Sequence, residues 1–88
     1  MKFKNFKPKK IVVERIEYCR GHVRQEGEKL DDAFERSVSI RLDSIGKLDL
    51  TFMSEHTNSS WGCGSGELLS PEEVVALKKL LENVEVEE

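Results

Sequence analysis

The sequence predicts an α+β fold, in which a three-stranded antiparallel β-meander precedes a C-terminal amphipathic helix packed on one face of the sheet. Three observations predict it: strict alternation of apolar and polar residues over 34–53, a complete helix signature over 70–84, and a β-branched run near residue 11. An isolated hairpin is marginal in water, so its apolar face needs a third strand or a helix. The 88 residues are expected to form a single small domain, 1–88.

The hairpin is predicted from period-two alternation, which puts every second side chain on one face of a strand. Phe34 continues the pattern backwards, and Gly46 in the segment 43–47 suits a tight turn. We therefore expect strands over about 34–43 and 47–53. The apolar members of the two strands are Val38, Ile40 and Leu42, then Leu48, Leu50 and Phe52.

The helix is predicted from its start signal. Ser70 is a preferred N-cap, Pro71 suits the first helical position, and Glu73 completes a capping box. Leu69 and Val74 are spaced for a hydrophobic staple across the cap. The apolar face consists of Val74, Leu77, Leu81 and Val84, with Leu80 beside it.

Residues 10–20 fit both a strand and a helix by spacing. The run Ile11–Val13, Tyr18 and Gly21 favour a strand. The expected organisation is a basic arm (1–9), the β-meander (10–53), a polar Gly/Ser loop (54–67), the helix (70–84) and an acidic tail (85–88). Trp61 lies in the loop, either packed on the edge of the domain or exposed as a contact anchor.

Composition excludes several classes of protein. The chain has 14 basic and 17 acidic residues, 38% hydrophobic and 35% charged, with a net charge of −3. No stretch approaches the roughly 18 apolar residues of a spanning helix, and the charged N-terminus lacks the apolar region of a secretory signal. We expect a cytoplasmic protein without a membrane partner. Residues 1–10 have five lysines and a net charge of +5, so the remainder sums to −8.

Two cysteines and two histidines form a candidate structural zinc site: Cys19, His22, His56 and Cys63. In a three-stranded meander the first and third strands end at the same edge, about 10 Å apart. Zinc there would fix the long loop and supplement a thin core. The alternatives are four unrelated side chains and a Cys19–Cys63 disulfide. A catalytic use of Cys63 with a histidine base has little support, so we expect no enzyme.

The small acidic domain with its CRGH and HTNSSWGC segments resembles the small phage-encoded inhibitors of type II CRISPR nucleases, some of which contain zinc. This resemblance in size, charge and Cys/His content implies a bacterial-host protein that docks on the guide-loaded nuclease and hinders entry of target DNA. An acidic surface would compete for the basic channel of such a nuclease. The candidate partner-binding residues are Glu26, Glu28, Asp31, Asp32, Glu35 and Trp61.

The alternative function is a single-stranded nucleic-acid-binding module, dimeric in one version. Its charge would come from the lysine arm and from strand arginines, and its stacking platform from Tyr18, Phe34, Phe52 or Trp61. The negative charge outside the arm argues against it. Steep salt dependence of binding to single-stranded DNA would separate this function from protein binding.

Overall fold

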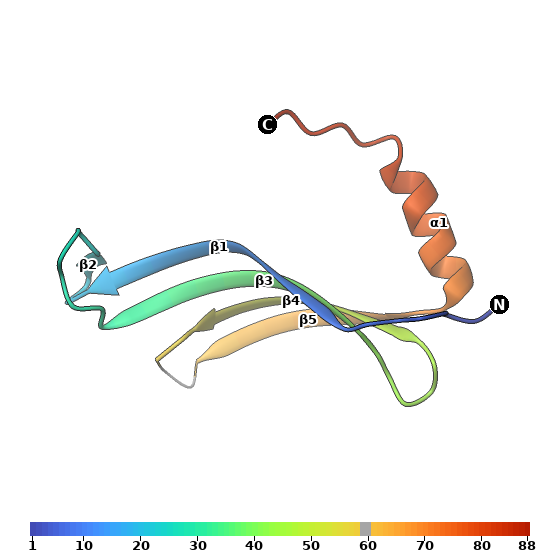
Figure 1. Ribbon diagram of the computed structural model, residues 1–88, viewed down its shortest axis with the longest axis horizontal. Helices are drawn as coiled ribbons and strands as arrows, with labels where there is room; N and C mark the ends of the chain where they lie inside the picture. Colours follow the sequence, from blue (N-terminus) through green and yellow to red (C-terminus); the bar gives the residue numbers. More distant parts are fainter. Residues whose placement is uncertain (59–60) are drawn as a thin grey trace.

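The computed structural model describes residues 1–58 and 61–88. These residues form five strands and a helix: β1 (Lys9–Cys19), β2 (His22–Val23), β3 (Asp32–Leu42), β4 (Leu48–His56), β5 (Gly62–Leu69) and α1 (Pro71–Leu81). All strand pairs are antiparallel, and the order across the sheet is β2-β1-β3-β4-β5 (Figure 1). The α+β class is confirmed, but the three-stranded meander is wrong.

The longer of the two missed strands is β5, which occupies residues 62–67 of the predicted polar loop 54–67, and β4 extends into the start of that loop as far as His56. The sequence prediction failed because glycine and serine are poor strand formers by composition, whereas pairing with β4 supplies the hydrogen bonds of this segment. Cys63 lies opposite Ser54, and Leu69 opposite Leu48. Residues 59–60 of the predicted loop lie outside the described residues.

The predicted hairpin and the first strand are confirmed. Val38 pairs with Phe52 and Ile40 with Leu50, in the register that the alternation predicts. Asp43 Oδ1 accepts hydrogen bonds from the backbone N–H groups of Ile45 and Lys47, both at 3.0 Å, and so closes the turn. Residues 9–19 are a strand, bent by a bulge between Val12 and Glu14.

A short extra strand, β2, folds back on the end of β1. The turn between them consists of Arg20 and Gly21, both with positive φ (49° and 83°), as two-residue hairpin turns with primed geometry require. Tyr18 pairs with Val23 and Cys19 with His22. The acidic segment that follows leads from this end of the sheet into β3.

The sheet has an apolar face and a polar face, because cross-strand partners share a face and successive residues alternate. One face has the rows Ile11–Val38–Phe52 and Leu42–Leu48–Leu69. The other has charged and small side chains, including Ser37, which is buried, and Gly64 beside Met53. We call these the apolar face and the polar face.

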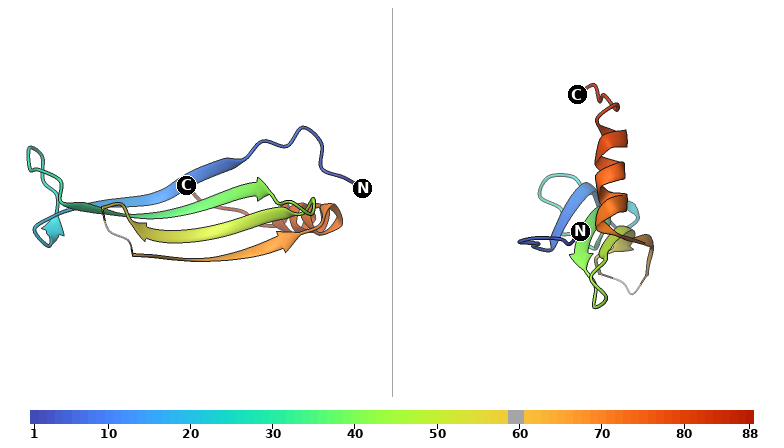
Figure 2. Two further views of the ribbon diagram at one scale, coloured as in Figure 1. Left: turned by 90° about the horizontal axis from the view of Figure 1, so that it is seen from below. Right: turned by 90° about the vertical axis from the view of Figure 1, so that its right-hand side faces the viewer.

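The helix begins as predicted but does not cover the sheet. Ser70 Oγ accepts from the backbone N–H of Glu73 at 3.2 Å, and Glu73 Oε1 accepts from that of Ser70 at 3.0 Å, which completes the capping box. Val74 and Leu77 turn toward the sheet, yet no residue of α1 is buried. Figure 2 shows α1 projecting from one end of the sheet, next to β5.

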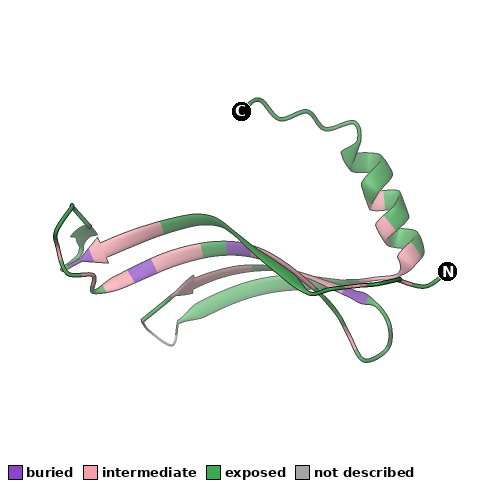
Figure 3. Ribbon diagram, in the orientation of Figure 1, coloured by how far each residue is buried: buried purple, intermediate pink, exposed green. Residues whose placement is uncertain are grey.

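The core is correspondingly small. Among the described residues the buried apolar side chains are Cys19, Ala33 and Leu48, whereas Ile11 and Phe52 on the apolar face are 52% and 53% exposed. Figure 3 shows how few segments of the sheet are buried. The radius of gyration is 17.0 Å, against about 12 Å for a compact chain of this length. The predicted packing of the helix over one face is therefore wrong in extent: most of that face is open.

Candidate functional site

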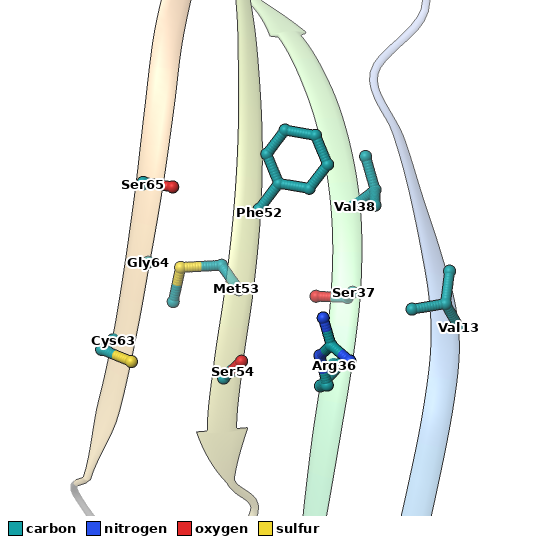
Figure 4. Close-up of a pocket in the computed structure, with 10 residues that line it drawn as sticks. All are labelled: Val13, Arg36, Ser37, Val38, Phe52, Met53, Ser54, Cys63, Gly64 and Ser65. Atoms are coloured by element: carbon teal, nitrogen blue, oxygen red, sulfur yellow. The ribbon is translucent and has the colours of Figure 1, made fainter.

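Two groups of side chains are candidates for a functional site, one at each end of the sheet. The first lies near the acidic segment, where β1 and β4 end and β3 begins, and the second lies between α1 and the apolar face. A shallow depression of roughly 500 Å³ also crosses β3, β4 and β5. Figure 4 shows its lining, which includes Arg36, Met53 and Cys63.

The first group is built around His56, the last residue of β4. Its Nδ1 lies 2.9 Å from Asp32 Oδ2, and its ring makes edge contacts with Phe34 and Trp61, at centroid distances of 5.6 and 5.1 Å. Phe34 faces His56 directly in the β3–β4 register. Strand pairing thus brings residues far apart in the sequence into one aromatic cluster beside an aspartate.

Asp32 holds the start of β3 and the residues after β4 together through hydrogen bonds. It accepts backbone hydrogen bonds from Asn58 at 3.1 Å and from Ala33 at 2.7 Å. The hydrogen bond from Asn58 first, then those from Ala33 and His56, lower the pKa of Asp32 below its usual value, because each favours the ionised carboxylate. Asp32 therefore stays ionised and connects the start of β3 to the end of β4.

The acidic segment before β3 is held by its own hydrogen bonds. Glu28 Oε2 accepts from the backbone N–H of Gln25 at 3.0 Å and lies 2.8 Å from His22 Nε2. The backbone donor of Gln25, followed by His22, lowers the pKa of Glu28. Asp31 accepts from the backbone N–H of Arg20, which ties the segment to the β1–β2 turn. These contacts give a negatively charged loop with a defined shape.

The predicted partner-binding residues divide into two groups. We define the acidic end as Glu26, Glu28, Asp31, Asp32 and Trp61; Figure 1 shows that these segments lie at the end of the sheet opposite α1. Trp61 is 53% exposed and lies in contact with His56.

Glu35 does not belong to the acidic end. It lies on the polar face with its side chain 14% exposed and bonded to Arg15. Its carboxylate is therefore committed to a contact within the chain and is poorly placed to meet a partner.

The four predicted zinc ligands come together as pairs and not as one group. Cys19 and His22 are cross-strand neighbours, but Cys19 is 3% exposed and its Sγ donates to the carbonyl oxygen of Lys29 at 2.9 Å. His56 and Cys63 lie on adjacent strands, β4 and β5, on the far side of β3.

Within residues 1–58 and 61–88, no three His, Cys, Asp or Glu side chains are grouped closely enough to hold a metal. The separation is lateral, because β3 and β4 lie between β1, which ends at Cys19, and β5, which has Cys63 near its start. Zinc binding by these residues stays a prediction. Both cysteines are free thiols in the structure.

The basic residues of the polar face are paired with carboxylates. Lys10 lies 3.3 Å from Glu55, and Arg41 lies 2.9 Å from Asp49. Arg15 bridges Glu35 and Glu17. The carboxylates of this face thus offset its cations, which leaves little positive charge for a phosphate backbone.

Sequence patterns did not identify two features of this site. The first is the role of Asp32 as the partner of His56, 24 residues away, because the predicted strands, 34–43 and 47–53, stop short of both residues. The second is the aromatic cluster, because no spacing pattern in the sequence links Trp61 to His56 and Phe34. The alternation that includes Phe34, extended by two residues, would have put Asp32 on the same face of the strand as Phe34.

The fold and the acidic end define a small α+β chain with one open antiparallel sheet and a charged, aromatic tip. Comparisons with protein-family models, with curated proteins and with solved structures each find no match. No helix in the described part of the chain is long and apolar enough to cross a membrane.

Proposed function

We propose that this chain is a non-enzymatic binding protein that docks on a protein partner with a basic surface through its acidic end. Following the resemblance in size, charge and Cys/His content, we further propose that the partner is a guide-loaded CRISPR effector nuclease, in the cytoplasm of a bacterial host, and that docking hinders binding of target DNA. The single observation that supports the proposal is that the exposed Trp61, which contacts His56 beside Asp32, lies at the same end of the sheet as the acidic loop.

Trp61 and its neighbours suit a protein contact. Tryptophan is enriched among the residues that dominate binding energy, since it offers a large rigid surface with few torsions to restrict. Contact with the His56 ring, itself fixed by Asp32, limits the orientations of the indole before binding. A side chain ordered in advance loses less entropy when it docks.

The carboxylates of the acidic end suit a basic partner. Glu28 and Asp32 have lowered pKa values, so both stay charged below neutral pH. Glu26 and Asp31 lie on the same exposed loop. Such a surface would attract the positively charged channel that holds nucleic acid in guide-loaded nucleases.

The experiment is a competition assay with a purified guide-loaded type II nuclease and a fluorescent target duplex. Titration with the parent protein should lower the fraction of duplex bound. Trp61→Ala and Glu26→Lys should each need at least about tenfold more protein for the same effect. Glu82→Lys is the matched control, because it makes the same charge change at the end of α1, and it should inhibit like the parent.

Two outcomes would contradict the proposal. One is unchanged duplex binding at every protein concentration across nucleases of this class. The other is inhibition that Trp61→Ala and Glu26→Lys leave intact. Tight binding of the protein alone to single-stranded DNA, falling steeply with salt, would instead favour the nucleic-acid-binding alternative.

A further inference from the structure

An open apolar groove separates α1 from the sheet. Val74, Leu77 and Leu81 line it from the helix, and Leu48 and Leu50 line it from the sheet. The groove has a volume of roughly 420 Å³. Val74 and Leu77 are half-buried, and Leu81 is 55% exposed, so the groove is only partly closed.

The groove continues into exposed apolar surface in both directions. On the sheet it leads to Ile11 and Phe52, each more than half exposed. On the helix it leads to Leu80, next to Leu81 and 68% exposed, and to Val84, which is 59% exposed and donates its backbone N–H to the carbonyl of Leu81. A single-domain chain rarely leaves contiguous apolar surface of this kind open unless something covers it.

The surface area that this chain leaves exposed can be compared with that of a compact monomer. The accessible surface is 7363 Å² for a mass of 10.1 kDa, whereas a compact monomer of this mass exposes about 5,300 Å². The excess is about 2,000 Å² per chain, or about 4,000 Å² for two chains. Interfaces of obligate homodimers bury roughly 2,000–5,000 Å² in total. The deficit of one chain therefore matches the contribution of one subunit to such an interface.

We propose that a second copy of this chain covers the apolar groove and the adjoining apolar face, so that the folded unit is a two-fold homodimer. A second copy is favoured over a foreign partner because every chain has this burial deficit as soon as it folds, before it meets any other protein. A two-fold interface also requires a self-complementary surface. The charges next to the groove make this surface self-complementary.

The complementary charges are at the two ends of the chain. The basic arm has Lys2, Lys4, Lys7 and Lys9, and the acidic tail has Glu85, Glu87 and Glu88. Phe3 and Phe6 place the arm at the groove, since both line it and their rings lie 6.3 Å apart. Figure 1 shows the tail continuing from α1 on the side of the sheet to which the helix projects. In a two-fold arrangement the arm of one copy would meet the tail of the other.

The test combines mass measurement with cross-linking of the parent protein. Light scattering should give about twice 10.1 kDa at micromolar concentration, and the urea midpoint should fall on tenfold dilution, because dimerisation stabilises by mass action. A carbodiimide, which joins amines directly to carboxylates, should link the arm to the tail in an equal mixture of ¹⁴N and ¹⁵N chains. Linked peptides of mixed isotope content would come from two different copies.

Phe52→Glu puts a charge in the proposed interface, and it should weaken dimerisation at least about tenfold. Ile45→Glu makes the same change at a residue that is 70% exposed in the β3–β4 turn, and it should leave dimerisation unchanged.

A mass of 10.1 kDa with a urea midpoint independent of protein concentration would overturn the proposal. Cross-linked peptides that contain only one nitrogen isotope would also overturn it, and so would open-ended assemblies larger than a dimer. The assay contains no nuclease, so its failure is distinguishable from failure of the proposed function.

Discussion

Gly64 gives the sharpest test of the strand that the sequence analysis missed. A Cβ built on Gly64 would overlap Met53 Sδ and lie 2.8 Å from the carbonyl oxygen of Phe52. The methionine side chain can move, but the carbonyl belongs to the paired backbone of β4 (Figure 4). Gly64→Ala should therefore destabilise the protein by about 1–3 kcal/mol, the usual cost of overpacking.

The matched control is Gly62→Ala in the same strand. Its Cβ would lie 3.4 Å from the Cβ of Glu55, an ordinary contact. Without a clash, alanine should be neutral or should stabilise by up to about 0.5–1 kcal/mol, because it restricts the unfolded chain more than glycine does. The two variants should thus differ in sign as well as in size.

The assay is urea unfolding of both variants and the parent at one fixed protein concentration. If residues 62–67 were part of a flexible loop, as predicted from their composition, both substitutions would be neutral or mildly stabilising. Equal midpoints for Gly64→Ala and Gly62→Ala would therefore refute the pairing of β5 with β4 in this register.

Three further predictions follow from individual contacts. Ser70→Ala removes the side-chain acceptor for Glu73 and should cost about 1 kcal/mol in unfolding experiments, with a matching loss of helical signal in far-ultraviolet circular dichroism; an unchanged signal would contradict the capping role. Cys63 is exposed and Cys19 is buried, so a thiol reagent should modify one cysteine quickly in the native protein and two in urea; protection of both, with one equivalent of zinc on metal analysis, would instead support the zinc prediction. The pKa of Asp32 is lower in the folded state, so its stabilisation is present at neutral pH and is lost as pH falls through the folded value. Asp32→Asn should accordingly lower the urea midpoint at pH 7 and have a smaller effect near pH 2, and equal effects at both values would contradict the assignment.

Local sequence determined the elements whose signals lie within a few residues. The capping box of Ser70 and Glu73 fixed the start of the helix, because both partners lie in one turn. Alternation fixed the register of Val38 with Phe52, because a slip by one residue would move every apolar side chain to the other face. The class of fold could therefore be predicted from the chain alone.

Tertiary structure decided which distant segments become neighbours in the sheet. The glycine-rich strand β5 forms because β4 offers it a ladder of hydrogen bonds, and no local preference of its residues indicates that partner. Strands β3 and β4 separate Cys63 from Cys19, and the far end of the β3–β4 register brings Asp32 to His56. Each of these outcomes depends on contacts between distant segments, whose free energy exceeds the weak local propensities that a sequence pattern reports.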